Sequence, residues 1–402
     1  MRIDEVELRV VRLPYRSPFK TSFGNEAEKH AIITTVRSEG VEGYGEGVMD
    51  PFPMYREETI PGALHLLRAA FGPDLIAKGC ALPSELTARW AHWRGNPMAK
   101  TALELAVWDC YARQQDVPLR TLLGGERTEI PVGASLGMAS LADTVDNVRR
   151  HVEQGYKRVK LKIEPGWDID LLAAVRAEFP AIELTVDANS AYTLEMIDVL
   201  RRIDEFGLHY IEQPLHWDDL VEHAQLATML STPLCLDESL TSPARVCAAL
   251  DLQACKVVNV KVGRVGGLQS VREIHDMCVT RGVPMWCGGM LESGIGRAHN
   301  IHLATMPGFV YPGDTASASR TYARDIVEQQ LEATDSSFRG AGAVGPAPTF
   351  LAFRREEVLR RTTEWTRAGR VTRGRFPLPA RGERVSVRGR ICVDARLDSS
   401  QR

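Results

Sequence analysis

The spacing of hydrophobic positions divides the chain into stretches with different expected structures. Up to residue 125, two-residue alternation and β-branched runs predict strands, whereas apolar positions three and four residues apart predict amphipathic helices. The predicted strands cover residues 6–13, 31–36 and 40–47, and the predicted helices cover residues 57–71, 84–93 and 98–113. Gly124 and Gly125 interrupt the helical pattern, so we expect an α+β unit to end there.

A second periodicity begins near residue 130, where short apolar runs alternate with amphipathic stretches at intervals of about 25 residues. One strand, one helix and two short loops need that length, so the repeat predicts successive β-α units. The expected strands cover residues 131–135, 158–163, 182–187, 208–212, 233–237, 256–261, 284–287 and 309–312. Eight such units predict an α/β fold with a TIM-like barrel. An open doubly wound sheet is the alternative, but the sequence lacks its glycine-rich turn after the first strand.

Composition and the search for targeting signals limit the class of protein and its expected location in the cell. The 402 residues are 44% hydrophobic and 25% charged with a net charge of −3, which is typical of a globular protein with two or three domains. The N-terminus alternates charged and apolar residues, unlike a signal peptide, and no apolar run is long enough to span a bilayer. We therefore expect a cytoplasmic protein, a homo-oligomer, with no membrane or nucleic-acid partner.

The C-terminal region differs from the rest of the chain. Residues 351–402 contain 14 Arg, no Lys and six acidic residues, so the body of the chain is acidic. Few apolar anchors occur in this region, which is typical of a segment without a core of its own. Two interpretations remain open for it: a genuine extension, or an out-of-frame translation of a GC-rich gene.

Acidic residues end three consecutive predicted barrel strands. They are Asp187, Glu212 and Asp237, spaced 25 residues apart. The C-terminal ends of parallel strands meet at the barrel mouth, where three carboxylates would repel one another without a cation between them. An all-oxygen set suits Mg²⁺, with Mn²⁺ or another divalent ion possible, rather than Zn²⁺. The alternative is that each acid caps the helix after its strand.

Lysines accompany these acids. Lys160 and Lys162 share one face of a predicted strand by its two-residue period, and Lys261 ends a strand across the barrel. Helices cover the outside of a parallel barrel, so the lysines are expected to point inward. Close to one another and to a metal ion they would have lowered pKa values and act as general bases. Solvated lysines on an exposed strand are the alternative interpretation.

Two bases on opposite sides of a metal-bound carboxylate suit one class of reaction, the removal of a proton next to that carboxylate. The ion would stabilise the ene-diolate intermediate while a lysine takes the proton. Return of the proton by the opposite lysine gives racemisation. If that lysine instead stays a cation while a group leaves, the result is elimination.

Several motifs around these residues resemble those of a known family. They are the KxK of Lys160 and Lys162, VDAN with Asp187, IEQPL with Glu212, LDES with Asp237 and NVKVGRVGG with Lys261. Together they resemble the enolase superfamily, muconate-lactonising subgroup. The segments at residues 286–297 and 312–315 are similar to the o-succinylbenzoate synthase and N-succinylamino acid racemase group.

The resemblance implies a (β/α)7β barrel with an N-terminal α+β capping domain whose loops, at residues 19–24 and 49–55, close over the substrate. The implied units are residues 1–125 (capping domain), 126–322 (barrel) and 323–366 (a segment returning to the capping domain). Residues 367–402, an Arg-rich tail, do not match the family and are expected to be disordered or non-native. The implied metal ligands are Asp187, Glu212 and Asp237, the implied bases are Lys162 and Lys261, and Lys160, Arg264 and Asn189 support them. Further candidates, for contact with the substrate, are Phe19, Phe23, Met49, Tyr55, Ser135, Met290 and Leu291.

The resemblance implies a small-molecule carboxylate as substrate but leaves its identity open. We favour an N-acyl(succinyl)amino acid racemase with o-succinylbenzoate synthase activity, because Arg264, three residues after Lys261, could lower the pKa of that lysine. The alternative is a dedicated synthase that removes water by syn elimination in menaquinone biosynthesis. Dipeptide epimerases carry DxD at the last strand, whereas only Asp314 is present here. From another class of function, a non-catalytic barrel with an arginine-rich binding tail is less favoured because the acids and lysines are intact.

Overall fold

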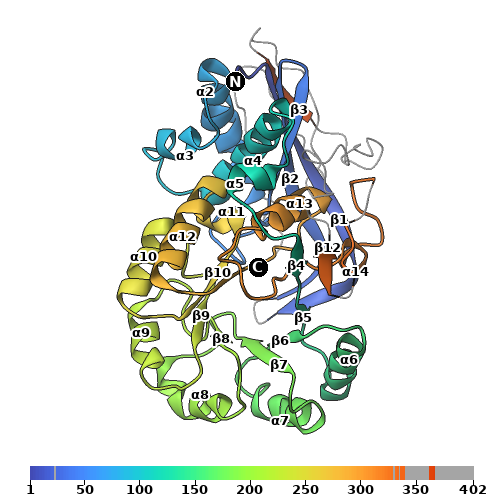
Figure 1. Ribbon diagram of the computed structural model, residues 1–402, viewed down its shortest axis with the longest axis vertical. Coiled ribbons are helices and arrows are strands. Elements are labelled where there is room, and N and C mark those ends of the chain that lie inside the picture. The colour runs from blue at the N-terminus through green and yellow to red at the C-terminus, as the bar shows by residue number, and fades with distance from the viewer. Residues whose placement is uncertain (22–23, 329–330, 335, 340–361, 367–402) are drawn as a thin grey trace, which may run out of the picture.

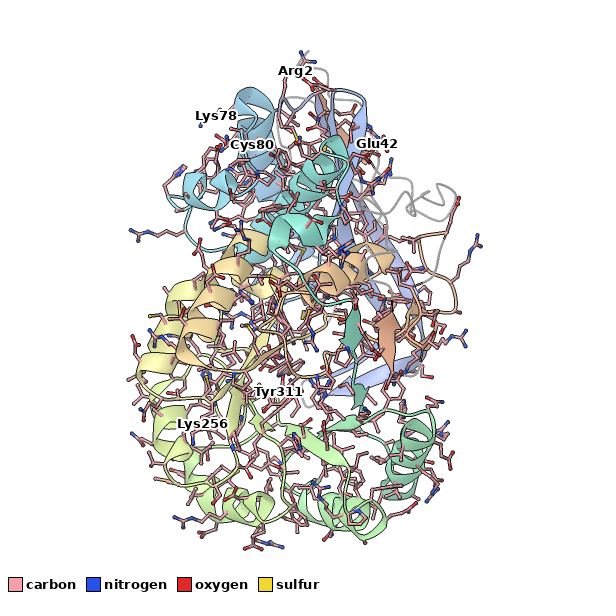
Figure 2. The ribbon with its side chains drawn as sticks, viewed as in Figure 1. Arg2, Glu42, Lys78, Cys80, Lys256 and Tyr311 are labelled. Atoms are coloured by element: carbon pink, nitrogen blue, oxygen red, sulfur yellow. The ribbon has the colours of Figure 1, made fainter. Side chains whose placement is uncertain are left out.

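The computed structural model describes residues 1–21, 24–328, 331–334, 336–339 and 362–366, which form an N-terminal α+β unit beside a larger barrel unit (Figure 1). In Figure 2, the labelled side chains of Arg2 and Glu42 lie in the N-terminal unit, far from Lys256 and Tyr311 of the barrel. The predicted α/β fold with a TIM-like barrel and an N-terminal α+β domain is confirmed. The predicted tail, residues 367–402, lies outside the described residues.

An antiparallel sheet with the strand order β13-β1-β2-β3 forms one layer of the N-terminal unit. Its strands are β1 (Glu5–Thr21), β2 (Gly24–Ser38), β3 (Val41–Gly47) and β13 (Thr362–Thr366). The long helix α4 (Pro97–Gln114) lies against it so closely that a Cβ atom at Gly43 or Gly45 would come within 2.3 or 2.4 Å of a carbonyl oxygen of the helix. The glycines of β3 therefore permit this packing.

Shorter helices complete the N-terminal unit. They are α1 (Ile60–Leu66), the π-helix η1 (Leu67–Phe71), α2 (Gly72–Lys78) and α3 (Glu85–Arg89). The helix predicted over residues 57–71 thus begins later and changes to π-helical hydrogen bonding in its last five residues. The helix predicted over residues 84–93 is shorter than expected, because only α3 is helical there.

Seven parallel strands follow in chain order and form a curled sheet, from β5 to β11 (Figure 1). They are β5 (Ala134–Leu136), β6 (Arg158–Lys162), β7 (Glu183–Asp187), β8 (Ile211–Glu212), β9 (Leu234–Leu236), β10 (Val257–Val260) and β11 (Met285–Cys287). The main helices after them are α6 (Leu141–Glu153), α7 (Ile169–Glu178), α8 (Ile197–Asp204), α9 (Val221–Ala227), α10 (Pro243–Asp251), α12 (Leu268–Arg281) and α13 (Gly294–Leu303). Outward-facing residues such as Val159 and Leu161 of β6 belong to the large apolar core.

The eighth expected strand, residues 309–312, is not a regular strand. Phe309 forms an isolated bridge to Met285 of β11, and Gly313 forms one to Val132 beside β5. Pro307 lies just before this segment and Pro312 ends it, and neither can donate a backbone hydrogen bond, which explains why no continuous ladder forms. The segment nevertheless connects the two ends of the curled sheet.

The remaining elements are short. They are α5 (Leu119–Leu123), β4 (Glu129–Pro131), η2 (Leu194–Met196), α11 (Val262–Val265), α14 (Ala318–Thr321) and β12 (Ser337–Arg339), which pairs with β4. Within the described part of the chain, none of the helices has both the length and the apolar character to cross a membrane.

Candidate active site

The C-terminal ends of adjacent barrel strands bring the predicted acids together. Asp187 ends β7 and Glu212 ends β8, and the strand register pairs Asp187 with Lys162 on one side and with Glu212 on the other. Asp237 follows β9 directly, and all three carboxylates are buried. Because parallel strands place their ends at one edge of the barrel, the regular spacing in the sequence becomes proximity in space.

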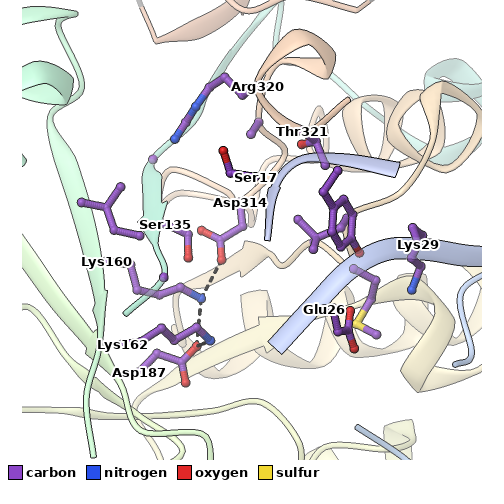
Figure 3. A pocket seen from close by; sticks show the side chains of 18 of the residues that line it. Ser17, Glu26, Lys29, Ser135, Lys160, Lys162, Asp187, Asp314, Arg320 and Thr321 are labelled. Atoms are coloured by element: carbon purple, nitrogen blue, oxygen red, sulfur yellow. Dashed lines mark hydrogen bonds and ion pairs between the residues drawn. The ribbon is translucent and has the colours of Figure 1, made fainter. Parts of the chain in front are cut away.

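Lys160 contacts three carboxylates inside the barrel. Its Nζ atom lies 2.6 Å from Asp314 Oδ2 and 3.2 Å from Asp187 Oδ2 (Figure 3). It also lies 3.1 Å from Glu212 Oε2. Burial disfavours the charge of Lys160, but these carboxylates outweigh it and hold its pKa well above the usual value. Lys160 therefore stays protonated and neutralises part of the acidic cluster.

Lys162, two residues further along β6, lines the cavity and contacts one carboxylate and one amide. Its Nζ atom lies 2.7 Å from Asp187 Oδ2 and donates a hydrogen bond to Asn189 Oδ1 over 2.6 Å. Asn189 adopts a φ of 42°, and its amide nitrogen donates to Glu238 Oε1 over 2.9 Å. The second residue of the VDAN motif after Asp187 thus orients the lysine, and Glu238 in turn orients Asn189.

Lys261 follows β10, and three strands of the sheet separate β10 from β6, which carries Lys160 and Lys162. Its Nζ atom lies 2.7 Å from Asp237 Oδ2 and donates to the Tyr55 hydroxyl over 3.3 Å. Burial lowers the pKa of Lys261, but Tyr55 and the carboxylate of Glu238 raise it, and the net pKa is raised. The lowered pKa values expected from the sequence presuppose a bound cation, whereas the carboxylates that face Lys160 and Lys261 raise the pKa of each lysine.

Arg264 lies beside Lys261 and is fully buried. Its guanidinium forms an ion pair with Asp237 Oδ1, donates to the Tyr55 hydroxyl over 3.1 Å and donates to the Leu240 carbonyl oxygen over 2.8 Å. Arg264 therefore acts on Lys261 through the carboxylate and hydroxyl that both side chains share.

A cavity of about 450 Å³ opens over these residues, a size that suits a small ligand. The barrel contributes Ser135, Lys160, Lys162, Asp187, Asn189, Lys261, Met290, Leu291 and Asp314, and the N-terminal unit contributes Tyr15, Ser17, Glu26, Lys29, Asp50 and Tyr55. The cavity thus lies between the two units. Ten of its residues are labelled in Figure 3.

Four of the seven candidates for contact with the substrate line this cavity, and the other three are not among its described lining residues. Ser135, Tyr55, Met290 and Leu291 are lining residues. Met49 is not among them within the described chain, because its side chain is buried in the apolar core of the N-terminal unit. Phe23 and the side chain of Phe19 lie outside the described residues.

Comparison with known proteins agrees with this architecture. Residues 4–124 match the mandelate racemase / muconate lactonizing enzyme N-terminal domain, and residues 143–345 match the family described as enolase C-terminal domain-like. The chain belongs to the enolase superfamily. The resemblance inferred from the motifs is thereby confirmed.

Relatives within the superfamily carry two kinds of name. The chain is 50% identical over 336 residues to the N-succinylamino acid racemase of Thermus thermophilus, covering 83% of this chain and 91% of the relative. It is 47% identical over 347 residues to the o-succinylbenzoate synthase of Geobacillus kaustophilus, covering 86% and 92%. A solved enolase superfamily structure from Listeria innocua matches with a TM-score of 0.85 and 37% identity, covering 91% of this chain and 99% of that chain.

Three further polar residues of the barrel were not predicted from the sequence. Asp314 pairs with Lys160 and, over 2.6 Å, with Arg158, and Asn259 donates to Glu212 Oε1 over 2.7 Å. The strand period could have indicated two of them, because Arg158 precedes Lys160 by two residues and Asn259 precedes Lys261 by two. Asp314 lies after the irregular closing segment, where no period exists.

The histidines of the RAHNIH segment lie away from the cavity. His299 and His302 are buried in α13, and burial lowers the pKa of each, that of His302 to about 3. Neither residue lines the cavity in the described part of the chain.

Proposed function

We propose that this chain racemises N-acyl amino acids of the N-succinyl class, small-molecule carboxylates, by moving the α-proton between Lys162 and Lys261. The observation that carries the proposal is their placement. Lys162 reaches the cavity from β6 and Lys261 from the end of β10, and the strands between them end in or next to Asp187, Glu212 and Asp237. A substrate anchored over the three acids would have one lysine on each face of its α-carbon.

We further propose that Asp187, Glu212 and Asp237 hold Mg²⁺, for which Mn²⁺ is the closest substitute. In the described chain, no group of three Asp, Glu, His or Cys side chains is close enough to hold a metal ion as it stands, because lysines lie between the acids. One observation supports a cation nonetheless. Burial and then the charge of Asp187 raise the pKa of Glu212 to about 7, so a positive charge placed between these acids would stabilise their ionised forms.

When bound, the ion would supply positive charge that stabilises the negative charge developing on the substrate carboxylate. The chain's own residues orient the lysines and the carboxylates. Asn189 orients the Lys162 amine, and the Tyr55 hydroxyl and Arg264 orient Asp237 beside Lys261. Lys160 keeps its proton and stabilises the acids electrostatically rather than acting as a base.

A second activity, o-succinylbenzoate synthesis in menaquinone biosynthesis, uses the same groups. The relatives named synthase are 40% to 47% identical to this chain, a range that overlaps the 43% of the racemase relative from Amycolatopsis sp. Elimination needs one base and a cation on the opposite face, and the raised pKa of Lys261 favours a cation there. A single site of this kind would serve both reactions.

Hydrogen exchange at the α-carbon tests the proposal. The chain is incubated with Mg²⁺ and an N-succinylamino acid in D₂O, and mass spectrometry follows deuterium uptake while chiral chromatography follows inversion. We expect uptake and inversion in the wild type and loss of inversion, by about 1,000-fold or more, in Lys162→Ala and in Lys261→Ala. Absence of exchange in the wild type would refute the proposal.

Lys256→Ala serves as the matched control, because Lys256 is exposed just before β10 and does not line the cavity. Its exchange rate is expected to equal that of the wild type. The cyclohexadiene precursor of o-succinylbenzoate, assayed alongside, tests the second activity: product formation supports it, and its absence restricts the chain to racemisation.

A further inference from the structure

Among the residues that the structure describes, Arg320 is a cation of the cavity without an acidic partner. It belongs to α14 and lines the cavity, as Lys29, Lys160, Lys162 and Lys261 do. Each of those lysines lies within 3.5 Å of a carboxylate oxygen. For Arg320, no ion pair with an acidic residue occurs among the described residues. Its positive charge is therefore not neutralised by the protein there.

Neutral groups hold the Arg320 guanidinium in place. Its Nη2 atom lies 2.7 Å from His151 Nε2, its Nη1 atom donates to the Tyr156 hydroxyl over 3.4 Å, and its Cζ atom lies 5.3 Å from the centre of the Tyr156 ring. His151 Nδ1 lies 2.6 Å from the Asn147 carbonyl oxygen, which can only accept. Nδ1 therefore carries the hydrogen, and Nε2 accepts from Arg320.

The imidazole adds no charge to this arrangement. Burial, together with the neighbouring arginines, lowers the pKa of His151, so that it stays neutral at physiological pH. A guanidinium fixed by a neutral imidazole and an aromatic ring keeps its full charge and has N–H donors left for a ligand.

Arg320 and the proposed catalytic lysines line the same cavity but lie in different parts of it. Figure 3 shows Arg320 and Ser17 on one side of the view and Lys162 with Asp187 on the other, with Ser135 and Asp314 between them. Asn147 and His151 also line the cavity, so this end is polar and carries net positive charge. It is suited to an anionic group at a distance from the reacting carbon.

We propose that Arg320 binds the distal carboxylate of the succinyl group, with His151 and Tyr156 positioning its guanidinium. The inference rests on the proposed function, since both named activities of the relatives involve a succinyl group. That group carries a second carboxylate, which a planar guanidinium can bind through two parallel hydrogen bonds. Arg320 thereby selects succinyl over neutral acyl groups.

Paired substrates test this role. N-succinyl and N-butanoyl derivatives of one amino acid differ at the end of the acyl chain, where a methyl group replaces the carboxylate. We expect Arg320→Met to reduce the succinyl-to-butanoyl ratio of kcat/KM about 30- to 100-fold, mainly through KM of the succinyl substrate. Arg320→Lys, which keeps the charge but loses the planar fork, is expected to retain part of the preference.

Arg281→Met is the matched control, since Arg281 is exposed on α12 and does not line the cavity. It should leave the ratio at the wild-type value. An unchanged ratio in Arg320→Met, or equal losses for both substrates, would overturn the assignment of Arg320 to the succinyl carboxylate.

A binding measurement separates this proposal from the proposed function. Isothermal titration of N-succinylglycine and N-butanoylglycine measures affinity without turnover. A preference for the succinyl compound that Arg320→Met removes supports the site even if no racemisation occurs. A succinyl preference that persists in Arg320→Met refutes the site even if racemisation is found.

Discussion

The Tyr55 hydroxyl donates a hydrogen bond to Oδ1 of Asp237 over 2.9 Å. Tyr55 belongs to the loop after β3 in the N-terminal unit, and Asp237 follows β9 of the barrel, so the bond joins the two units at the reacting groups. The neighbouring Arg56 donates to the Glu238 carbonyl oxygen over 3.2 Å and stacks 4.6 Å from the ring of Trp217. This loop therefore helps to position Asp237 as well as closing the cavity.

Removal of the Tyr55 hydroxyl tests its positioning role. In Tyr55→Phe, the ring is retained but Asp237 and Lys261 lose a shared hydrogen-bond partner, and we expect kcat/KM to fall about 10-fold with little change in Tm. Steady-state kinetics and thermal unfolding measure the two effects. Tyr111→Phe on α4, away from the cavity, is the control. A wild-type kcat/KM in Tyr55→Phe would show that the loop only shields the substrate.

Asp314 is predicted to be essential for stability as well as activity. Asp314→Asn leaves Arg158 and Lys160, both buried, with one fewer negative partner, and a buried charge that loses its partner costs about 3 kcal/mol. We expect a lower free energy of unfolding by urea denaturation together with a lower kcat. Asp198→Asn, at a side chain that is 95% exposed, should change neither quantity. Equal stabilities of the two variants would contradict the prediction.

The predictions from the sequence were most accurate for residues whose positions depend on the two-residue period of a strand or on the ends of parallel strands. Lys160 and Lys162 share a face because strand side chains alternate, and Asp187 and Glu212 come together because parallel strands end at one edge. Both relationships are local in the chain or fixed by the repeat. For that reason the acids and lysines could be predicted before any contact was known.

Contacts between distant segments could not be predicted in the same way. Tyr55 was expected only to contact the substrate, but its hydroxyl contacts Asp237, which follows 182 residues later in the chain. Arg320 reaches His151 across 169 residues from a helix of four residues that no pattern indicated. Such contacts depend on how the two units and the closing segment pack, which periodicity does not report.

Glu104 joins the two units at a second place, away from the cavity. From α4 it accepts hydrogen bonds from the backbone nitrogens of Leu268 and Gln269, over 2.9 and 3.1 Å, at the start of α12, and from Trp108 Nε1 over 2.8 Å. Burial nevertheless raises the pKa of Glu104 from 4.5 to about 7. The folded state therefore binds a proton at this carboxyl more tightly than the unfolded state does.

Stability is predicted to decrease with pH through this group. A folded-state pKa above the unfolded value gives stability that is fully present below about pH 4.5 and lost as pH rises through about 7, by up to about 3 kcal/mol. Glu104→Gln removes this part of the pH dependence, although the amide leaves one backbone donor unsatisfied. Urea denaturation at several values between pH 5 and 8 measures the slope, with Glu273→Gln, exposed on α12, as control. Equal slopes in the wild type and in Glu104→Gln would exclude the group.

Metal binding is predicted to stabilise the fold. Mg²⁺ that binds the native chain and not the unfolded chain should raise Tm with the logarithm of one plus its concentration over Kd, and a chelator should reverse the change together with the activity. Asp187→Asn, Glu212→Gln and Asp237→Asn are each expected to reduce the shift. Asp276→Asn, at an exposed residue of α12, is the control. A Tm that Mg²⁺ leaves unchanged would contradict the proposed ligand set.

The two ends of the C-terminal region are predicted to differ in importance. Strand β13 pairs with β1 along five residues, from Glu5 opposite Thr366 to Arg9 opposite Thr362. A chain ending at residue 366 keeps this pairing and should retain the wild-type Tm and activity. A chain ending at residue 339 leaves β1 as an open edge and should unfold at a lower temperature and aggregate more readily. Thermal unfolding and light scattering compare the two. Loss of folding or activity in the chain ending at residue 366 would show that residues 367–402 are part of the functional protein.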